Sequence, residues 1–130
     1  MKVLTIREPY ASLILHGIKK IETRSWKTNY RGELYIHSGI SKMSKDILNN
    51  KKLMNLYAGI SPSYGKIICK CNLVDVVEMS SDYIKNVRED ELICGRFEVG
   101  NYAWILDDIE IINPIECKGK LGIWNYDEGN

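Results

Sequence analysis

The segment 17–26, GIKKIETRSW, gathers side chains that could bind a ligand together. From Ile18 we predict a strand, whose period of two places Glu22, Arg24 and Trp26 on one face and Ile21, Thr23 and Ser25 on the other. A carboxylate beside a guanidinium offers hydrogen-bond acceptors and donors side by side, which is what the edge of a nucleobase needs. The indole of Trp26 adds a surface on which a base can stack, and Lys19 adds a point charge for phosphate.

Further polar residues near this segment extend the candidate binding site. Arg7 precedes it, Lys27 and Arg31 follow it around a predicted turn, and His37 lies near the end of the next predicted strand, ELYIHS. We expect the three basic side chains to contact phosphates and the histidine to donate or accept a hydrogen bond at neutral pH. The alternatives are structural: an ion pair that only forms part of the surface, and a histidine that only satisfies the backbone.

Short strand and helix patterns alternate through the rest of the chain and position these residues. The predicted strands cover residues 2–6, 18–26, 33–38 and 65–79, followed by two or three short strands within 102–124 that are broken at Asp107–Asp108, at Pro114 and at a glycine-containing turn. The predicted helices begin at Pro9 and end at Gly17, cover residues 42–57, and cover residues 80–95. Five or six strands with short helices between them predict an α+β domain built on a small β-barrel.

Length and composition indicate one compact domain covering residues 1–130. The chain is 45% hydrophobic, yet it has no apolar run near the roughly 18 residues that cross a bilayer, and its first residues include charges. We therefore expect a soluble, cytoplasmic protein with no membrane contact. The four cysteines contain no C-x-x-C pair, and P-loop, G-x-G-x-x-G, H-E-x-x-H and G-x-S-x-G motifs are absent. We expect free thiols, no metal and no cofactor.

Charge is distributed unevenly along the chain. The net charge is +1, but residues 1–52 carry eleven Lys and Arg against four Asp and Glu, and residues 53–130 carry seven against thirteen. This asymmetry predicts a basic surface that suits phosphates. The alternative is a fold that intermixes the two halves and removes the asymmetry.

The stretch PYASLILHGIKKIETRSWKTNYRGELYIHS closely resembles the signature of the ASCH (activating signal cointegrator 1 homology) domain family, a PUA-like family with the hallmark G-x-K-x-x-E-x-R. The four hallmark positions are occupied by Gly17, Lys19, Glu22 and Arg24. The resemblance continues through GKIICKCNLVDVVE, NYAWILDD and NPIECKGKLGIW, and so covers nearly the whole chain. It implies a PUA-like β-barrel with a cleft near the signature that binds single-stranded RNA, or a free nucleoside or nucleotide.

The same resemblance leaves two other functions open. Some ASCH-like proteins hydrolyse N4-acetylcytidine with a lysine, a threonine and a glutamate, and their signature reads G-x-K-x-x-T-x-R. This chain keeps Lys19 but has Glu22 in place of the threonine, and we expect slow or absent hydrolysis with these two residues as the catalytic pair. Thr23 is predicted to point to the opposite strand face, and the further acid is either Glu78 or Glu98. A protein-interaction module in RNA-linked regulation is the other alternative.

Overall fold

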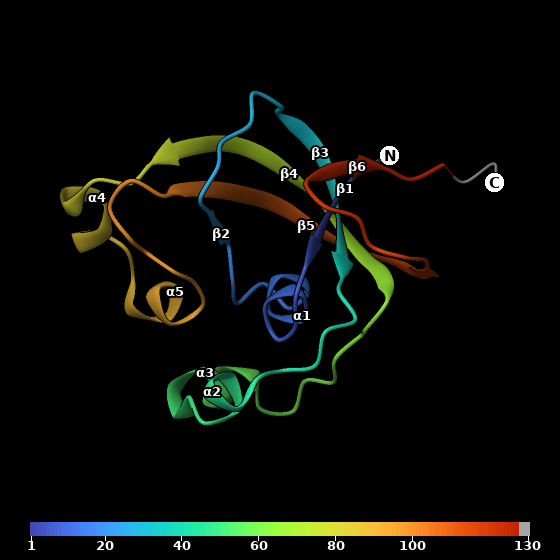
Figure 1. The fold of residues 1–130 in the computed structure, drawn as a ribbon, viewed down its shortest axis with the longest axis horizontal. Helices are drawn as coiled ribbons and strands as arrows, with labels where there is room; N and C mark the ends of the chain where they lie inside the picture. The colour runs from blue at the N-terminus through green and yellow to red at the C-terminus, as the bar shows by residue number, and fades with distance from the viewer. Residues whose placement is uncertain (128–130) are drawn as a thin grey trace.

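The computed structural model describes residues 1–127, which form six strands and five short helices (Figure 1). In chain order the elements are β1 (Lys2–Ile6), α1 (Tyr10–Leu15), β2 (Ile21–Arg24), β3 (Gly32–Ser38), α2 (Lys45–Leu48), α3 (Lys51–Tyr57), β4 (Lys66–Glu78), α4 (Ser81–Lys85), α5 (Glu89–Ile93), β5 (Tyr102–Glu116) and β6 (Ile123–Asn125). No helix within residues 1–127 is both long enough and apolar enough to cross a membrane.

All six strands form one mixed sheet in the order β2-β5-β4-β3-β1-β6. Only β1 and β3 run parallel, and the other neighbours are antiparallel. The long strands β4 and β5 arch, so the sheet curls into a half-open barrel (Figure 1). This architecture confirms the predicted α+β fold on a small PUA-like barrel with short surrounding helices.

The main core fills the concave side of the sheet. Helix α1 lies within the curl, and its residues 11–14 are fully buried against β3, β4 and β5 (Figure 1). Trp104 of β5 is completely buried in this core, and Trp124 of β6 is buried in a smaller cluster, as the apolar strand patterns predict. A third cluster joins Leu13 of α1 to Leu53 of α3 and Cys94. Helix α1 therefore stands between the sheet and the outer helices and fixes the loops at both of its ends.

Two helices predicted as continuous are each divided into two short ones. The predicted helix 42–57 is interrupted at Asn49–Asn50, because the Oδ1 atom of Asn50 accepts from the N–H of Leu53 at 3.1 Å and caps α3. The predicted helix 80–95 is likewise divided into α4 and α5. Asparagine caps compete with helix continuation, which explains the first interruption.

The last part of the sheet departs from the prediction of several short strands. Strand β5 continues from Tyr102 to Glu116 through Asp107–Asp108 and Pro114. Asp108 takes a positive φ of 52°, and the pairing register with β4 shifts nearby. The two aspartates therefore lie in an irregular part of a continuous strand and do not form a turn. The end of β5 pairs with β4 alone, and a strand with one free side tolerates proline.

Candidate functional site

The signature glycine terminates α1 and redirects the chain. Gly17 adopts a φ of +74°, a conformation that favours glycine, directly after the last turn of the helix. The N–H groups of Ile18 and Lys19 both donate to the carbonyl of Leu13, at 3.0 and 3.1 Å. This compact turn directs the Lys19 side chain inward before β2 begins.

Lys19 is completely buried, and protein acceptors surround its ammonium group. The Nζ atom donates to the carbonyls of Ile21 at 2.5 Å and Cys94 at 2.6 Å, and lies 3.4 Å from Oε1 of Glu22. It also lies 5.6 Å from the centre of the Tyr10 ring. A buried ammonium is tolerated only with such partners, so Lys19 joins β2, the 94–96 loop and Glu22.

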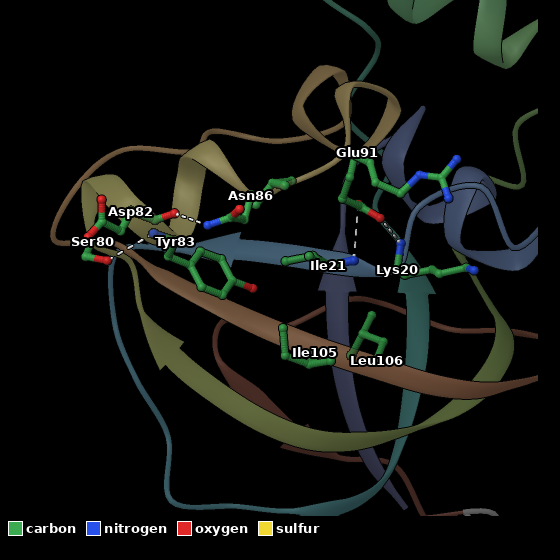
Figure 2. Close-up of a pocket in the computed structure, with 11 residues that line it drawn as sticks. Lys20, Ile21, Ser80, Asp82, Tyr83, Asn86, Glu91, Ile105 and Leu106 are labelled. Carbon is green, nitrogen blue, oxygen red and sulfur yellow. Dashed lines mark hydrogen bonds between the residues drawn. The ribbon is translucent and has the colours of Figure 1, made fainter.

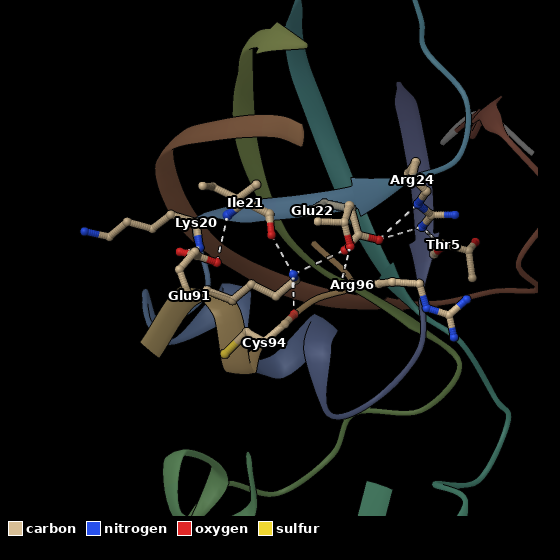
Figure 3. A network of polar contacts seen from close by, with 10 residues as sticks. Thr5, Lys20, Ile21, Glu22, Arg24, Glu91, Cys94 and Arg96 are labelled. Carbon is tan, nitrogen blue, oxygen red and sulfur yellow. Dashed lines mark hydrogen bonds and ion pairs between the residues drawn. The ribbon is translucent and has the colours of Figure 1, made fainter. Parts of the chain in front are cut away.

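Glu22 lies between two cations (Figure 3). Its Oε1 atom faces Lys19, and its Oε2 atom accepts from Nε of Arg24 at 3.0 Å and lies 2.9 Å from Nη2 of Arg24. The same Nη2 atom donates to the carbonyl of Thr5 at 3.0 Å. These bonds hold a carboxylate that is only 8% exposed, and they orient the guanidinium of Arg24.

This network forms one wall of a cavity of about 570 Å³, called here the signature cavity. Three guanidinium groups line it from separate segments: Arg7 before α1, Arg24 on β2 and Arg96 after α5. Trp26 also lines it, and its ring packs edge-on against Trp104 with centroids 4.8 Å apart. The other lining residues are Tyr10, Glu22, Thr23, Ser25, Cys94, Gly95 and Asn101. The cavity thus combines cations with a fixed aromatic ring.

Two lining groups show the effect of burial on acidity. Burial raises the pKa of the Cys94 thiol to about 11, although nearby Lys19 acts in the opposite direction. Burial also raises the pKa of Tyr10. Both groups therefore stay protonated at neutral pH, and the Cys94 thiol is not activated as a nucleophile.

A second cavity, of about 660 Å³, lies between α4, α5 and the β2–β5 pair (Figure 2). Its walls are largely apolar, with Tyr83, Val87 and Leu106 among them. The carboxylate of Glu91 on its rim already accepts from the N–H groups of Lys20 and Ile21, at 2.9 and 3.2 Å. Because most of its wall surface is apolar, whereas that of the signature cavity is mostly polar, we take the smaller signature cavity as the candidate site.

The comparison with known families matches residues 4–119 to the ASCH domain. The chain belongs to the ASCH domain family. It is 46% identical over 129 residues to activating signal cointegrator 1 from Homo sapiens and 52% identical to the same protein from Mus musculus. Each match covers 95% of this chain but 22% of the relative, so the chain spans about a fifth of the relatives' length.

The ASCH signature residues occupy different layers of the site. Glu22, Arg24 and Trp26 line the signature cavity together with Arg7. Lys19 lies behind Glu22 and does not line it. The signature therefore supplies both the wall of the cavity and the buried support of that wall.

Three other residues predicted to bind lie elsewhere in this ASCH domain. Arg31 donates to the carbonyls of Thr28 and Tyr30 and lies 3.7 Å from a carboxylate oxygen of Asp75. Lys27 is exposed, and neither basic residue lines the signature cavity. His37 is buried and lines a different cavity. A binding role for these three residues stays a prediction.

His37 belongs to a chain of hydrogen bonds whose directions are fixed. Its Nε2 atom lies 2.8 Å from the carbonyl of Cys117, which can only accept, so Nε2 carries the proton. Its Nδ1 atom lies 3.3 Å from the Thr5 hydroxyl, which in turn accepts from Nε1 of Trp124 at 3.0 Å. In the neutral imidazole, Thr5 donates to Nδ1. His37 therefore fixes the chain after β5 to β1.

The hydrolase residues of the sequence analysis are also dispersed. Glu78 accepts from the Tyr102 hydroxyl at 3.2 Å, and Glu98 lies 3.8 Å from Nε of Arg96; neither carboxylate lines the signature cavity. Thr23, which the strand alternation predicts on the opposite face, lines this cavity with Glu22. Its hydroxyl accepts from the N–H of Arg96 at 2.9 Å, so the 94–96 loop reaches around to that side of β2.

Sequence reasoning missed Arg96 and Asn101 as cavity residues. Arg96 is 72 positions from Arg24, in the half of the chain where acidic residues predominate. Gly95 gives a partial signal: a Cβ atom there would lie 3.1 Å from the Thr23 hydroxyl oxygen, so a glycine allows the loop to approach β2. Close backbone approach is a common reason for a loop glycine, but the sequence does not name the partner.

Proposed function

We propose that this ASCH domain binds single-stranded RNA and holds one nucleotide in the signature cavity. The observation that carries the proposal is the convergence of three guanidinium groups and the Trp26 ring on a cavity of about 570 Å³. A volume of roughly 300 to 1,000 Å³ is typical of small-ligand sites, and nucleotides combine a charged phosphate with a base that stacks. The likeness to RNA-linked ASCH domains supports the same ligand class.

Different residues of the cavity contact the phosphate, the face of the base and the edge of the base. Arg7 and Arg96 are exposed, and Arg7 makes no side-chain hydrogen bond or ion pair within residues 1–127, so both are placed to contact phosphate. Trp26 offers its ring to the base, since Trp104 holds it edge-on. Glu22 and Arg24 read the base edge: a carboxylate has about four acceptor positions, of which Lys19 and Arg24 occupy some.

Hydrolysis of an acylated nucleoside has less support than binding. Lys19 is completely buried and its ammonium already has three protein acceptors, so it has no direction left for a substrate. The Cys94 thiol stays protonated because burial raises its pKa to about 11. A general acid or base must reach the proton that it transfers, and neither group offers this.

Binding of a fluorescein-labelled octauridylate, followed by fluorescence anisotropy, tests the proposal. Trp26→Ala should lose stacking worth roughly 1 to 3 kcal/mol with little change in salt dependence. Arg96→Ala should weaken binding and reduce the log–log salt slope by about 0.7 for one lost phosphate contact. Arg88→Ala is the matched control, because Arg88 is also exposed but lines the cavity near α4.

The outcomes separate the two cavities. Equal losses from Arg88→Ala and Arg96→Ala would mean that the RNA uses charge without using the signature cavity. No binding at low salt by a wild-type protein with a cooperative unfolding transition would overturn the proposal and favour a protein partner. Turnover of N4-acetylcytidine by the wild type would favour the hydrolase instead.

A further inference from the structure

Two further cavities lie in a row with the signature cavity, and each shares lining residues with the one before it. The next one, of about 440 Å³, shares Arg7, Glu22, Thr23 and Arg24 with it. The third, of about 740 Å³, shares Thr5, Gly39, Ser41 and Leu121 with the second. Because neighbouring cavities share lining residues, the three lie in a row from β2 past the end of β1 to residues 117–121, and together they are called here the groove. A free nucleoside needs only one of the three.

The far end of this groove has unpaired positive charge. Lys118 and Lys120 line it, and both are exposed. Neither forms an ion pair with a carboxylate within residues 1–127, although Glu116 lies on the same wall. The Nζ atom of Lys120 lies 5.8 Å from the centre of the Trp124 ring. The two lysines are thus free to meet an anion.

Apolar and aromatic surface lies beside these lysines. Leu121 is 98% exposed and Ile40 is 77% exposed, and both line the far cavity with the ring of Tyr64. Apolar side chains grouped at an exposed, hollow site mark a binding surface. The far end therefore repeats the combination found in the signature cavity, namely cations beside an aromatic ring.

We propose that the whole groove binds one RNA strand of about three nucleotides, one for each cavity. Lys118 and Lys120 form a second phosphate-binding site, and Tyr64 forms a second stacking surface. This inference rests on the proposed function, because it extends the same strand beyond the signature cavity. It identifies the ligand as an RNA polymer. A site for a free nucleoside would use the signature cavity alone.

The walls of the groove are held in place before any ligand arrives. Gly119 packs so closely against β1 that a Cβ atom there would lie 2.8 Å from the Thr5 hydroxyl oxygen. The bond from His37 to the Cys117 carbonyl fixes the same loop two residues earlier. Thr5 also accepts from Arg24 through its main-chain oxygen. One residue thereby links both ends of the groove, and such preorganisation reduces the entropy cost of binding.

A length series of labelled oligouridylates tests the inference. Affinity should rise from one to three nucleotides and then level off for the wild type. The double variant Lys118→Gln/Lys120→Gln should lose this rise and lower the log–log salt slope of the octamer by about 1.4, while it binds the mononucleotide as the wild type does. Lys45→Gln/Lys85→Gln removes two exposed helix lysines outside the groove and is the matched control.

Each outcome has a definite meaning. Tyr64→Ala should lower affinity for the trimer at least about fivefold and leave the mononucleotide unchanged. If the mononucleotide binds normally but extra length adds nothing, or if both double variants act alike, the groove proposal is wrong and the signature cavity stands alone. If neither mononucleotide nor octamer binds, the proposed function itself fails.

Discussion

The Nη2 atom of Arg24 lies 3.0 Å from the main-chain oxygen of Thr5 and donates to it. Arg24 is on β2 at one end of the strand order, whereas Thr5 is on β1, and these strands are not neighbours in the sheet. The bond therefore crosses the open side of the half-barrel. A signature residue that faces the cavity also joins the two sides of the fold.

Arg24→Lys should destabilise the fold although it keeps the charge. A lysine lacks the planar fork that bonds to Glu22 and Thr5 together, so we expect a loss of about 1 to 3 kcal/mol in the free energy of unfolding. Arg7→Lys is the matched control, since Arg7 makes no side-chain hydrogen bond within residues 1–127, and should change it by less than about 0.5 kcal/mol. Urea denaturation followed by circular dichroism measures both; coincident curves would contradict the role of Arg24.

Lys19→Met should cost far more than the same change at the next position. It leaves Glu22 with one cation fewer and the carbonyls of Ile21 and Cys94 without their donor. Breaking a buried pair in this way costs about 3 to 5 kcal/mol. Lys20→Met, at an exposed position, should stay within about 0.5 kcal/mol of the wild type. Similar urea midpoints for the two variants would show that the burial of Lys19 contributes little.

Gly119→Ala should strain the loop after β5. The new Cβ atom would lie 2.8 Å from Oγ1 of Thr5 and 3.0 Å from Cε1 of His37, which predicts an overpacking cost of about 1 to 3 kcal/mol. At Gly39 the nearest atom is Cγ2 of the same Thr5 at 3.4 Å, an ordinary contact, so Gly39→Ala should cost less. Thermal denaturation ranks the two variants, and the reverse order would contradict the packing described.

Stability should fall in mildly alkaline solution. Burial raises the pKa of the Cys69 and Cys71 thiols from 9.0 to about 12, and that of Cys94 to about 11. The unfolded chain therefore loses these protons first as pH rises, so the contribution is complete below pH 9 and is lost progressively toward the folded-state values. We expect a slope of up to about 1.4 kcal/mol per pH unit for each thiol between pH 9 and 10.

Urea denaturation under reducing conditions at pH 8, 9 and 10 measures this decline. Cys71→Ala removes one buried thiol and should make the slope shallower, whatever its stability at pH 7. An unfolding free energy that is equal at pH 8 and pH 10 would mean that the thiols ionise as easily in the folded protein as in the unfolded chain.

The fold and the central signature were predictable because their signals are local. A period of two places Glu22 and Arg24 on one face, and Gly17 ends a helix by its own conformational freedom. The burial of Lys19 was not predictable, because a lysine within a charged run is normally exposed and its carbonyl partner on Cys94 is 75 residues away. The position of Arg96 in the signature cavity was not predictable for the same reason, because only folding brings this residue close to β2.

The continuity of β5 shows another limit of local reading. Asp107–Asp108 has the composition of a turn, yet the N–H of Asp108 bonds to the side chain of Asp107 at 2.8 Å and the strand resumes. Long-range pairing with β4 outweighs the turn preference of two residues. Such an outcome depends on a partner strand, which the sequence of the segment itself does not contain.

The buried side chains of Lys19 and Glu91, which both bond to β2, also affect association between molecules. Both main-chain groups of Ile21 are occupied by side chains: its N–H donates to Glu91, and its carbonyl accepts from Lys19. An exposed edge strand with open donors and acceptors recruits strands from other chains and promotes aggregation. The Glu91 carboxylate and the Lys19 ammonium occupy the two main-chain groups of Ile21 to which another strand would bond. The sheet therefore ends at Ile21 without a proline or a covering strand.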